Sequence, residues 1–362
     1  MRYAVGVMGK IARWTVGRVG PTYWGFLAVP MLVVVLMLVA CDRPREPITF
    51  NGSTMGTVWT VRVSALPAGV SGPDLRAEIE ALLEQVNAEM STYRADSVIT
   101  AFNEAEADER VQLPAGFAAV LAEALYWAEA SGGAFDPTAG PLVNLWGFGP
   151  THREDQIPDE QDIQQAMEQI GWQRLEFRPG DDELTQPGGV YLDLSAIAKG
   201  WAVDLIADHL IELGVTGFLV DIGGDLRTHG RRPDGQYWRV AIEHPQPGGR
   251  ELHSIVELES IALATSGDYR NFFKADGRRF SHLIDPRTGF PVDHNTVSVT
   301  VLAERCMSAD AMATMLSIVP IDEAWALATE RDLAVLWLLA NGDQLTERMT
   351  PAFVRVTDTG AP

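Results

Sequence analysis

The residues best suited to chemistry lie in short polar segments that follow apolar ones. In residues 192–200, Asp193 ends an apolar stretch, and Lys199 falls in the first turn of a predicted helix. A helix N-terminus offers free amide donors and partial positive charge, which suit a phosphate, whereas a lysine there opposes the helix dipole. An anionic ligand would explain this placement of Lys199. The alternative is a simple Asp193–Lys199 ion pair.

A second group of polar residues lies nearer the C-terminus. His282 stands three residues before an Asp285-Pro286 turn, and Asp310 and Thr314 stand four apart on a predicted helix, so both project from one face. A carboxylate and a hydroxyl are hard oxygen ligands of the kind that Mg²⁺ prefers. The alternative for Asp310 is an acid near a helix start, stabilised by the helix dipole.

Three further segments combine glycine with polar residues: residues 53–57, 132–138 and 221–225. Their glycines permit backbone conformations that a side chain would forbid. By itself each segment is typical of a loop. Residues 221–225 follow a predicted strand, but they match neither the dinucleotide-binding nor the P-loop pattern of glycines.

The elements that must position these residues alternate between strand-like and helical patterns. Apolar residues recur at helical spacing after the start signal at residues 71–73. The helices are expected over residues 75–90, 117–130, 159–170, 197–213, 309–318 and 323–329. The strands are expected over residues 57–63, 190–194, 217–222, 237–243, 253–258, 297–301 and 334–339, with 237–243 and 253–258 antiparallel. This order predicts one compact α/β (α+β) domain.

The N-terminus has the pattern of a secretory signal. Residues 1–25 carry four basic residues and no acid, and residues 26–40 are apolar except for one proline. The apolar stretch is short compared with the roughly 20 residues of a membrane-spanning helix. Residues 38–41 resemble a bacterial lipobox, in which Cys41 is lipidated, and Asp42 resembles an inner-membrane retention signal. We therefore expect a signal peptide at 1–40, a lipid-anchored tether at 41–47 and an enzyme domain at 48–362. An uncleaved membrane anchor is the alternative.

Charge and cysteine content narrow the function further. The formal net charge is −21, and removal of residues 1–40 takes away four basic residues and no acid, which makes it −25. Such a surface would repel the phosphates of nucleic acid. Once Cys41 is lipidated only Cys306 remains, so no intramolecular disulfide can form.

Taken together, these segments resemble the ApbE family, the FAD:protein FMN transferases. The most specific pieces are residues 193–200, 221–225, 264–269 and 282–289. They occur in the family's order, and the resemblance extends from about residue 55 to about residue 339. It implies the family's fold, a mixed two-layer α/β sandwich of the T-fold type.

The resemblance also implies roles for individual residues. His282 would assist proton transfer, and we hypothesise that Asp285 orients it. Lys199 would serve both in catalysis and in FAD binding. The other FAD-contacting positions would be Met55, Tyr93, Ala134, Phe135, Asp136, Asp193 and Ile284. The Mg²⁺ ligands would be the backbone carbonyl of Ala196, the carboxylate of Asp310 and the hydroxyl of Thr314.

The implied reaction moves the FMN half of FAD onto a threonine of another protein and releases AMP. The partner would be a flavoprotein with an Asp-Gly-x-Thr-type site, such as a subunit of a membrane redox complex. The expected location is the periplasmic face of the bacterial inner membrane. Two alternatives stay open: an FAD pyrophosphatase that releases FMN and AMP, and a lipoprotein that holds FAD without chemistry.

Overall fold

An eight-stranded sheet is the centre of the fold. The computed structural model describes residues 46–150, 157–245, 251–268, 271–342 and 344–359, of which all belong to one compact unit. The sheet order is β1-β2-β5-β6-β9-β14-β15-β16, and every pairing is antiparallel. Its strands are β1 (Ile48–Thr54), β2 (Thr57–Val63), β5 (Phe218–Ile222), β6 (Asp225–His229), β9 (Ala262–Gly267), β14 (Thr296–Ala303), β15 (Ala334–Asn341) and β16 (Gln344–Met349).

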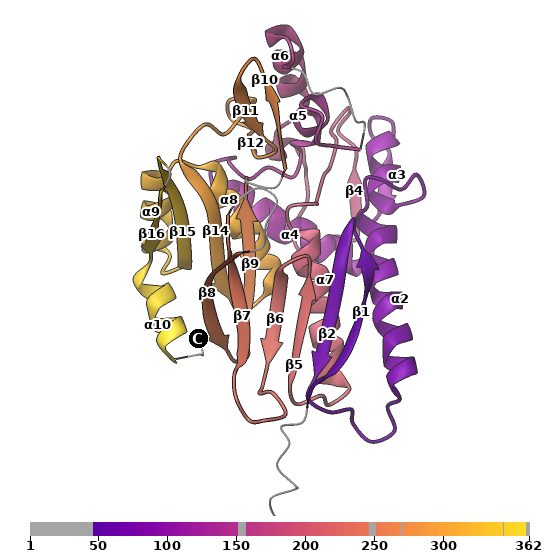
Figure 1. The fold of residues 1–362 in the computed structure, drawn as a ribbon. Helices are drawn as coiled ribbons and strands as arrows, with labels where there is room; N and C mark the ends of the chain where they lie inside the picture. The colour runs from indigo at the N-terminus through magenta and orange to yellow at the C-terminus, as the bar shows by residue number, and fades with distance from the viewer. Residues whose placement is uncertain (1–45, 151–156, 246–250, 269–270, 343, 360–362) are drawn as a thin grey trace, which may run out of the picture. The chain divides into compact units, whose positions relative to one another are not determined.

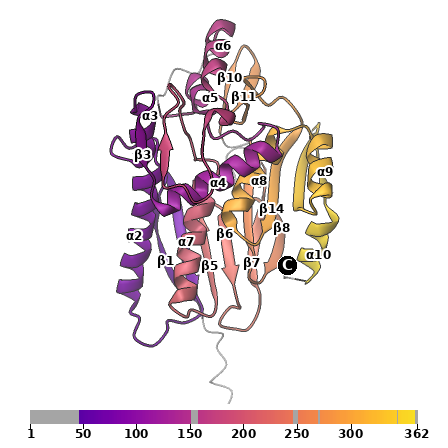
Figure 2. The same ribbon diagram turned by 180° about the vertical axis from the view of Figure 1, so that it is seen from behind.

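Four helices cover one face of this sheet: α2 (Gly72–Met90), α4 (Ala115–Ala130), α7 (Ala198–Glu212) and α8 (Cys306–Ile318). Figures 1 and 2 show this helix layer behind the sheet and in front of it, respectively. The main hydrophobic core lies between the two layers and includes Trp59, Phe218 and Trp337. This arrangement confirms the predicted mixed α/β fold.

The opposite face is covered in part by a two-stranded ribbon, β7 (Trp238–His244) and β8 (Glu251–Leu258), and by α10 (Pro351–Thr359) (Figure 1). A smaller cluster joins α5 (Gly140–Leu145) and α6 (Glu160–Gln169) to the hairpin of β10 (Phe272–Ala275) and β11 (Arg278–Ser281). The remaining elements are α3 (Val98–Glu104), β3 (Arg110–Gln112), a 3₁₀ turn (Trp172–Arg174), β4 (Glu183–Thr185), β12 (Ile284–Asp285), β13 (Phe290–Pro291) and α9 (Ile321–Glu330). None of the described helices is both long and apolar enough to cross a membrane.

The helices lie close to the positions that local sequence signals predicted. Helix α2 begins where predicted because the Ser71 side chain accepts a hydrogen bond from the Asp74 amide at 3.2 Å, which satisfies a free donor of the first turn. All six predicted helices are present within a few residues of their predicted ends, and β7 and β8 pair antiparallel as expected.

The strand predicted over residues 190–194 is wrong. The backbone of this segment bonds to a side chain instead of a strand. The side-chain amide of Asn103 donates to the Leu192 carbonyl at 2.9 Å and accepts from the Leu192 N–H at 2.7 Å. The sequence analysis also missed β1, β6, β9, β16 and α10, among other elements. The predicted signal peptide and residues 41–45 of the tether, including Cys41, lie outside the described residues.

Candidate functional site

Two tight turns lie next to each other at one end of the sheet. Met55 and Gly56 connect β1 to β2 with positive φ angles of 48° and 71°, and Gly223 and Gly224 connect β5 to β6 with 66° and 104°. A Cβ built on Gly223 would lie 2.9 Å from the methyl group of Thr57, so no side chain fits between the turns. These two turns are the sequence segments 53–57 and 221–225, which the antiparallel pairing of β2 with β5 brings together.

Lys199 lies in the first turn of α7, as predicted, and forms the charged centre of this end of the sheet. Its Nζ donates to the carboxylate of Asp225 at the start of β6 and lies 3.3 Å from the carboxylate of Asp310 on α8. Asp225 also accepts a hydrogen bond from the Thr265 amide of β9 at 3.2 Å. The alternative of an Asp193–Lys199 pair is wrong, because Asp193 turns to the amide and hydroxyl of Ser195.

The charges of this cluster do not cancel. Two carboxylates that are 5% and 7% exposed face a single ammonium group. Burial raises the pKa of Asp310 to about 7, although Lys199 acts to lower it. Burial alone would disfavour the charged ammonium of Lys199, but Asp225 and Asp310 outweigh it and raise the pKa of Lys199 above its ordinary value. When Asp310 is ionised, the cluster therefore carries an excess negative charge that a bound cation would neutralise.

The oxygen donors predicted for a magnesium ion lie on α8 and just before α7. Asp310 and the partly buried Thr314 lie one turn apart on α8, and Ala196, also partly buried, lies just before α7. A carboxylate, a hydroxyl and a backbone carbonyl are hard oxygen ligands. Among the described residues there is no group of three or more His, Cys, Asp or Glu side chains arranged to hold a metal, so a site here would take this mixed form.

Close packing of α7 on α8 holds the cluster together. The Gly200 amide donates to the Asp310 carboxylate at 3.0 Å, and a Cβ on Gly200 would come within 2.4 Å of the Cys306 carbonyl oxygen. One turn along α7, the fully buried Asp204 accepts a hydrogen bond from the Met307 amide at 2.9 Å, at the N-terminus of α8. Asp204 thereby fixes the start of the helix that carries Asp310.

The sequence analysis gave no role to Asp204 or Asp225. Arg227 and Arg305 complete the partners of Asp204, at 3.0 and 3.3 Å. The sequence did contain a signal for Asp204, which is an acidic residue on the apolar face of a predicted helix. Since a buried charge requires partners, such a residue indicates a buried ion pair or hydrogen-bond network. For Asp225 the signal was its position directly after the paired glycines.

His282 directly follows β11 and is oriented by the backbone. Its Nδ1 lies 3.0 Å from the Asn271 carbonyl oxygen, its own amide donates to the same oxygen at 3.1 Å, and its ring meets Phe148 edge-on. Nδ1 therefore carries the proton in the neutral ring, which leaves Nε2 as the proton acceptor. Burial lowers the pKa of His282 below its ordinary value of 6.5. The neutral base is thus the form present near pH 7.

Asp285 does not orient His282, which corrects that hypothesis. Its carboxylate accepts from the Arg287 guanidinium at 2.8 Å, and Arg287 also contacts Glu323 of α9 at 3.0 Å. The Asp-Pro turn directs the carboxylate along the chain toward residue 287 instead of back toward residue 282. Asp285 therefore anchors the turn to α9.

The loop of residues 132–140 packs against residues 190–193. The Asp193 amide donates to the Pro137 carbonyl at 2.8 Å, and a Cβ on Gly140 would overlap the Tyr191 ring at 2.3 Å. Asp136 holds the loop together, because its carboxylate accepts from the amides of Thr138 at 2.8 Å and Trp172 at 3.2 Å. Two distant segments of the predicted FAD site are thus in contact.

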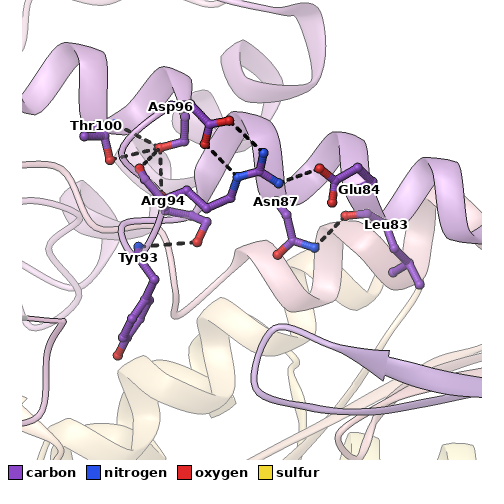
Figure 3. Close-up of polar contacts among 9 residues, drawn as sticks. Leu83, Glu84, Asn87, Tyr93, Arg94, Asp96 and Thr100 are labelled. Carbon is purple, nitrogen blue, oxygen red and sulfur yellow. Dashed lines mark hydrogen bonds and ion pairs between the residues drawn. The ribbon is translucent and has the colours of Figure 1, made fainter.

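The predicted FAD-contacting side chains differ greatly in exposure. Tyr93 is 73% exposed, and Figure 3 shows its ring pointing away from the ion pairs of Arg94 with Glu84 and Asp96. Partial desolvation by the surrounding protein and the nearby Asp193 charge raise the pKa of Tyr93, which places Tyr93 and Asp193 in one neighbourhood. In contrast, the side chains of Ala134, Phe135 and Ile284 are buried in the hydrophobic clusters. In this conformation these three residues present almost no surface to a ligand.

Known proteins resemble this chain over most of its length. A family model described as the ApbE family matches residues 55–337. The FAD:protein FMN transferase of Vibrio cholerae serotype O1 is 39% identical over 322 residues, which cover 89% of this chain and 96% of that protein. The enzyme of the same name from Haemophilus influenzae is 37% identical and covers 92% of this chain and 98% of its own.

Solved structures resemble the fold over the same span. The flavin transferase ApbE from Vibrio cholerae has a TM-score of 0.80 and 39% identity, with coverage of 86% of this chain and 99% of that chain. The apo form of the Pseudomonas stutzeri flavinyl transferase ApbE also has a TM-score of 0.80, with 38% identity and coverage of 88% and 98%.

Proposed function

The chain belongs to the ApbE family, and from this membership we infer that it is an enzyme that transfers FMN from FAD to a target protein. Because the matches extend over nearly the full length of the relatives, the inference concerns the whole enzyme and not a shared fragment. We further propose that the acceptor is a threonine hydroxyl, that the reaction depends on Mg²⁺, and that Lys199 and His282 are catalytic.

The cluster of Lys199, Asp225 and Asp310 is the observation that carries the proposed chemistry. Phosphoryl transfer needs positive charge where negative charge develops on the transferred and leaving groups. Lys199 supplies one such charge in the first turn of α7, where the helix dipole adds partial positive charge. Asp225 holds the ammonium in place and keeps it protonated.

The ligands that we propose for Mg²⁺ are the Asp310 carboxylate, the Thr314 hydroxyl and the Ala196 carbonyl. When bound, the ion would neutralise pyrophosphate charge and act as a Lewis acid toward its oxygens. The excess negative charge beside Lys199 supports this assignment. Asp310 must give up its proton to bind the metal, and the amide of Gly200 favours the ionised form that does so.

His282 is the proposed general base. The threonine oxygen attacks the phosphorus of the FMN half, the bond from that phosphorus to the oxygen of AMP breaks, and Nε2 of His282 accepts the threonine proton. The contact of Nδ1 with the Asn271 carbonyl supports this role, because it fixes the tautomer that leaves Nε2 free to accept. AMP leaves with the bonding electrons of the broken bond.

For FAD we propose a site between the turn at Met55 and the packed loops at Asp136 and Asp193, with Lys199 at the pyrophosphate. The exposed Tyr93 ring would cover the flavin. The buried Ala134, Phe135 and Ile284 would contribute by shaping the floor of the site.

The proposed setting is the periplasmic face of the bacterial inner membrane, with a lipid on Cys41 as the anchor. The lipobox-like residues 38–41 support this proposal. The target would be a flavoprotein of a membrane redox complex that carries an Asp-Gly-x-Thr-type site.

Intact-mass spectrometry of the acceptor tests the function. The full-length chain in detergent is mixed with FAD, Mg²⁺ and a flavoprotein domain with an Asp-Gly-x-Thr site. A mass gain of one FMN phosphoester that disappears when the threonine is changed to valine would establish the transfer. An unmodified acceptor with FMN and AMP in solution would indicate a pyrophosphatase, and intact bound FAD would indicate a carrier.

A further inference from the structure

Strand β1 leaves one edge of the eight-stranded sheet unpaired. It pairs with β2 along its full length, from Ile48↔Val63 to Thr54↔Thr57, without a bulge. Among the described residues no strand lies on its other side, and Figure 1 shows it at the border of the sheet, with α2 running alongside it. An unpaired strand of seven residues presents backbone groups to which another chain can pair.

The register shows which groups these are. Thr54 and Thr57 close a two-residue turn, so they form a hydrogen-bonded pair, and the bonded residues of β1 then alternate back along the strand. The backbone N–H and C=O groups of Thr49, Asn51 and Ser53 therefore point away from β2. All three residues are exposed. Together they form a regular row of donors and acceptors, which we call the β1 edge.

The opposite border of the sheet differs in its chemistry. Strand β16 carries Glu347 and Arg348, and these contact His253 at 2.8 Å and Asp322 at 3.4 Å. Charged residues on an edge strand discourage pairing with another chain, as does proline. The sequence of β1 contains neither a charged residue nor a proline. The two edges of one sheet are thus unequal, and only β1 is open to strand addition by this criterion.

We propose that the β1 edge binds the acceptor protein by adding an extended segment of that protein as a ninth strand. The proposal rests on the proposed function, because it names how the protein substrate of that reaction is held. The backbone of β1 leads directly into the turn at Met55, which lies beside the turn at Gly223 in the candidate site. A strand that pairs with β1 is therefore guided toward the end of the sheet where the reaction takes place.

Strand addition suits this type of substrate. Main-chain hydrogen bonds supply affinity for an extended peptide without reading its side chains, whereas pockets for alternate side chains add specificity. An enzyme that must present one threonine of a folded partner gains from holding the flanking backbone straight. The face of β1 and β2 opposite the helices offers Thr49, Asn51, Ser53 and Thr60 to the side chains of such a segment.

The substitution Asn51→Pro tests the proposal. Proline removes the outward N–H and blocks pairing, but it breaks no bond to β2 and is tolerated on an edge strand. The matched control Asn51→Ala removes the same side chain and keeps the N–H. With full-length chain in detergent, we expect Asn51→Pro to lower kcat/KM for the Asp-Gly-x-Thr acceptor domain about tenfold, chiefly through KM. FAD affinity and the melting temperature should match those of Asn51→Ala. Equal kcat/KM values for the two variants would overturn the proposal.

Amide hydrogen exchange gives a second measurement that does not depend on transfer. In the enzyme alone the amides of Thr49, Asn51 and Ser53 should exchange fast, whereas those of Phe50 and Gly52 are protected by β2. Addition of the acceptor domain should slow the first three. Unchanged exchange on acceptor binding would overturn the proposal, and so would protection already present in the enzyme alone, because another part of the chain would then cover the edge. If wild-type enzyme binds the acceptor at the β1 edge and never modifies it, the proposed function fails and this surface stands.

Discussion

The backbone N–H of Gly200 donates a hydrogen bond of 3.0 Å to the carboxylate of Asp310. This bond joins the first turn of α7 to the second turn of α8, between residues that lie 110 positions apart in the sequence. It also places Asp310 within 3.3 Å of the Lys199 ammonium. The proposed phosphate and metal sites are therefore built on a single helix–helix contact, and changes at that contact should affect both.

Gly200→Ala should disrupt this contact. The new Cβ would lie 2.4 Å from a backbone carbonyl oxygen, so α8 must move. We expect a loss of about 3 kcal/mol in the free energy of unfolding, together with weaker Mg²⁺ binding. Gly72→Ala is the control, because its Cβ meets nothing closer than the Phe50 ring at 3.7 Å. Urea denaturation of both variants checks the difference, and equal stability would contradict the packing argument.

Lys199→Met should both inactivate and destabilise the enzyme. It removes the ammonium and leaves the buried carboxylates of Asp225 and Asp310 without their cation, a change that typically costs about 3–5 kcal/mol. The double variant Lys199→Met with Asp225→Asn removes one of these charges and should recover part of the stability, but not the activity. If the double variant is no more stable than Lys199→Met alone, the unpaired carboxylate charges are not the cause of the instability.

Asp310→Asn should weaken Mg²⁺ binding by at least about 100-fold, as measured by calorimetry, because a neutral amide replaces the one charged ligand. In wild-type enzyme the metal competes with a proton, and burial raises the pKa of Asp310 to about 7. The apparent affinity should therefore be about tenfold weaker at pH 6 than at pH 8. Asp322→Asn, at an exposed position on α9, should leave both values unchanged. A pH-independent affinity would refute Asp310 as a ligand.

His282→Ala should slow transfer by about 10²–10⁴-fold while FAD binding stays nearly the same. The neutral imidazole is the active form, and burial lowers the pKa of His282 below 6.5. At saturating Mg²⁺ the wild-type rate should therefore hold as the pH falls through 6.5 and decline only at lower pH. His209→Asn, a change at the contact with Glu78 on another part of α7, serves as the control. Equal losses of transfer rate and FAD affinity in His282→Ala would argue against His282 as the general base.

Glu89→Gln should change how stability depends on pH. Burial raises the pKa of Glu89 above 4.5, although a hydrogen bond from Gln85 acts against it. Because the folded state prefers the neutral acid, the free energy of unfolding falls as the pH rises from about 4.5 through the raised pKa, and the loss persists at neutral pH.

Glutamine keeps the shape without the charge, so this part of the pH dependence should disappear in the Glu89→Gln variant. Urea denaturation at pH 4.5 and pH 8 measures it. Glu212→Gln, at an exposed position, provides the baseline. Identical pH dependence in wild type and Glu89→Gln would show that burial does not act on this carboxyl group.

The family, the α/β class and the helices that carry the site could all be predicted from the sequence. Helix signals are local: apolar spacing and the cap at Ser71 lie within one segment, and so do Lys199 at a helix start and the pair Asp310 and Thr314 on one face. The segments that resemble the ApbE family are likewise short and continuous. Such features depend only on neighbouring residues, and they were predicted correctly.

Which of these residues contact one another depends on the tertiary structure. Lys199 pairs with Asp225 and Asp310 and not with Asp193, which is nearer in the sequence. His282 contacts the Asn271 carbonyl and not Asp285. Both outcomes depend on the order of strands in the sheet and on the approach of α7 to α8. These are set by the burial of apolar surface across the whole domain, and no local pattern of residues encodes them.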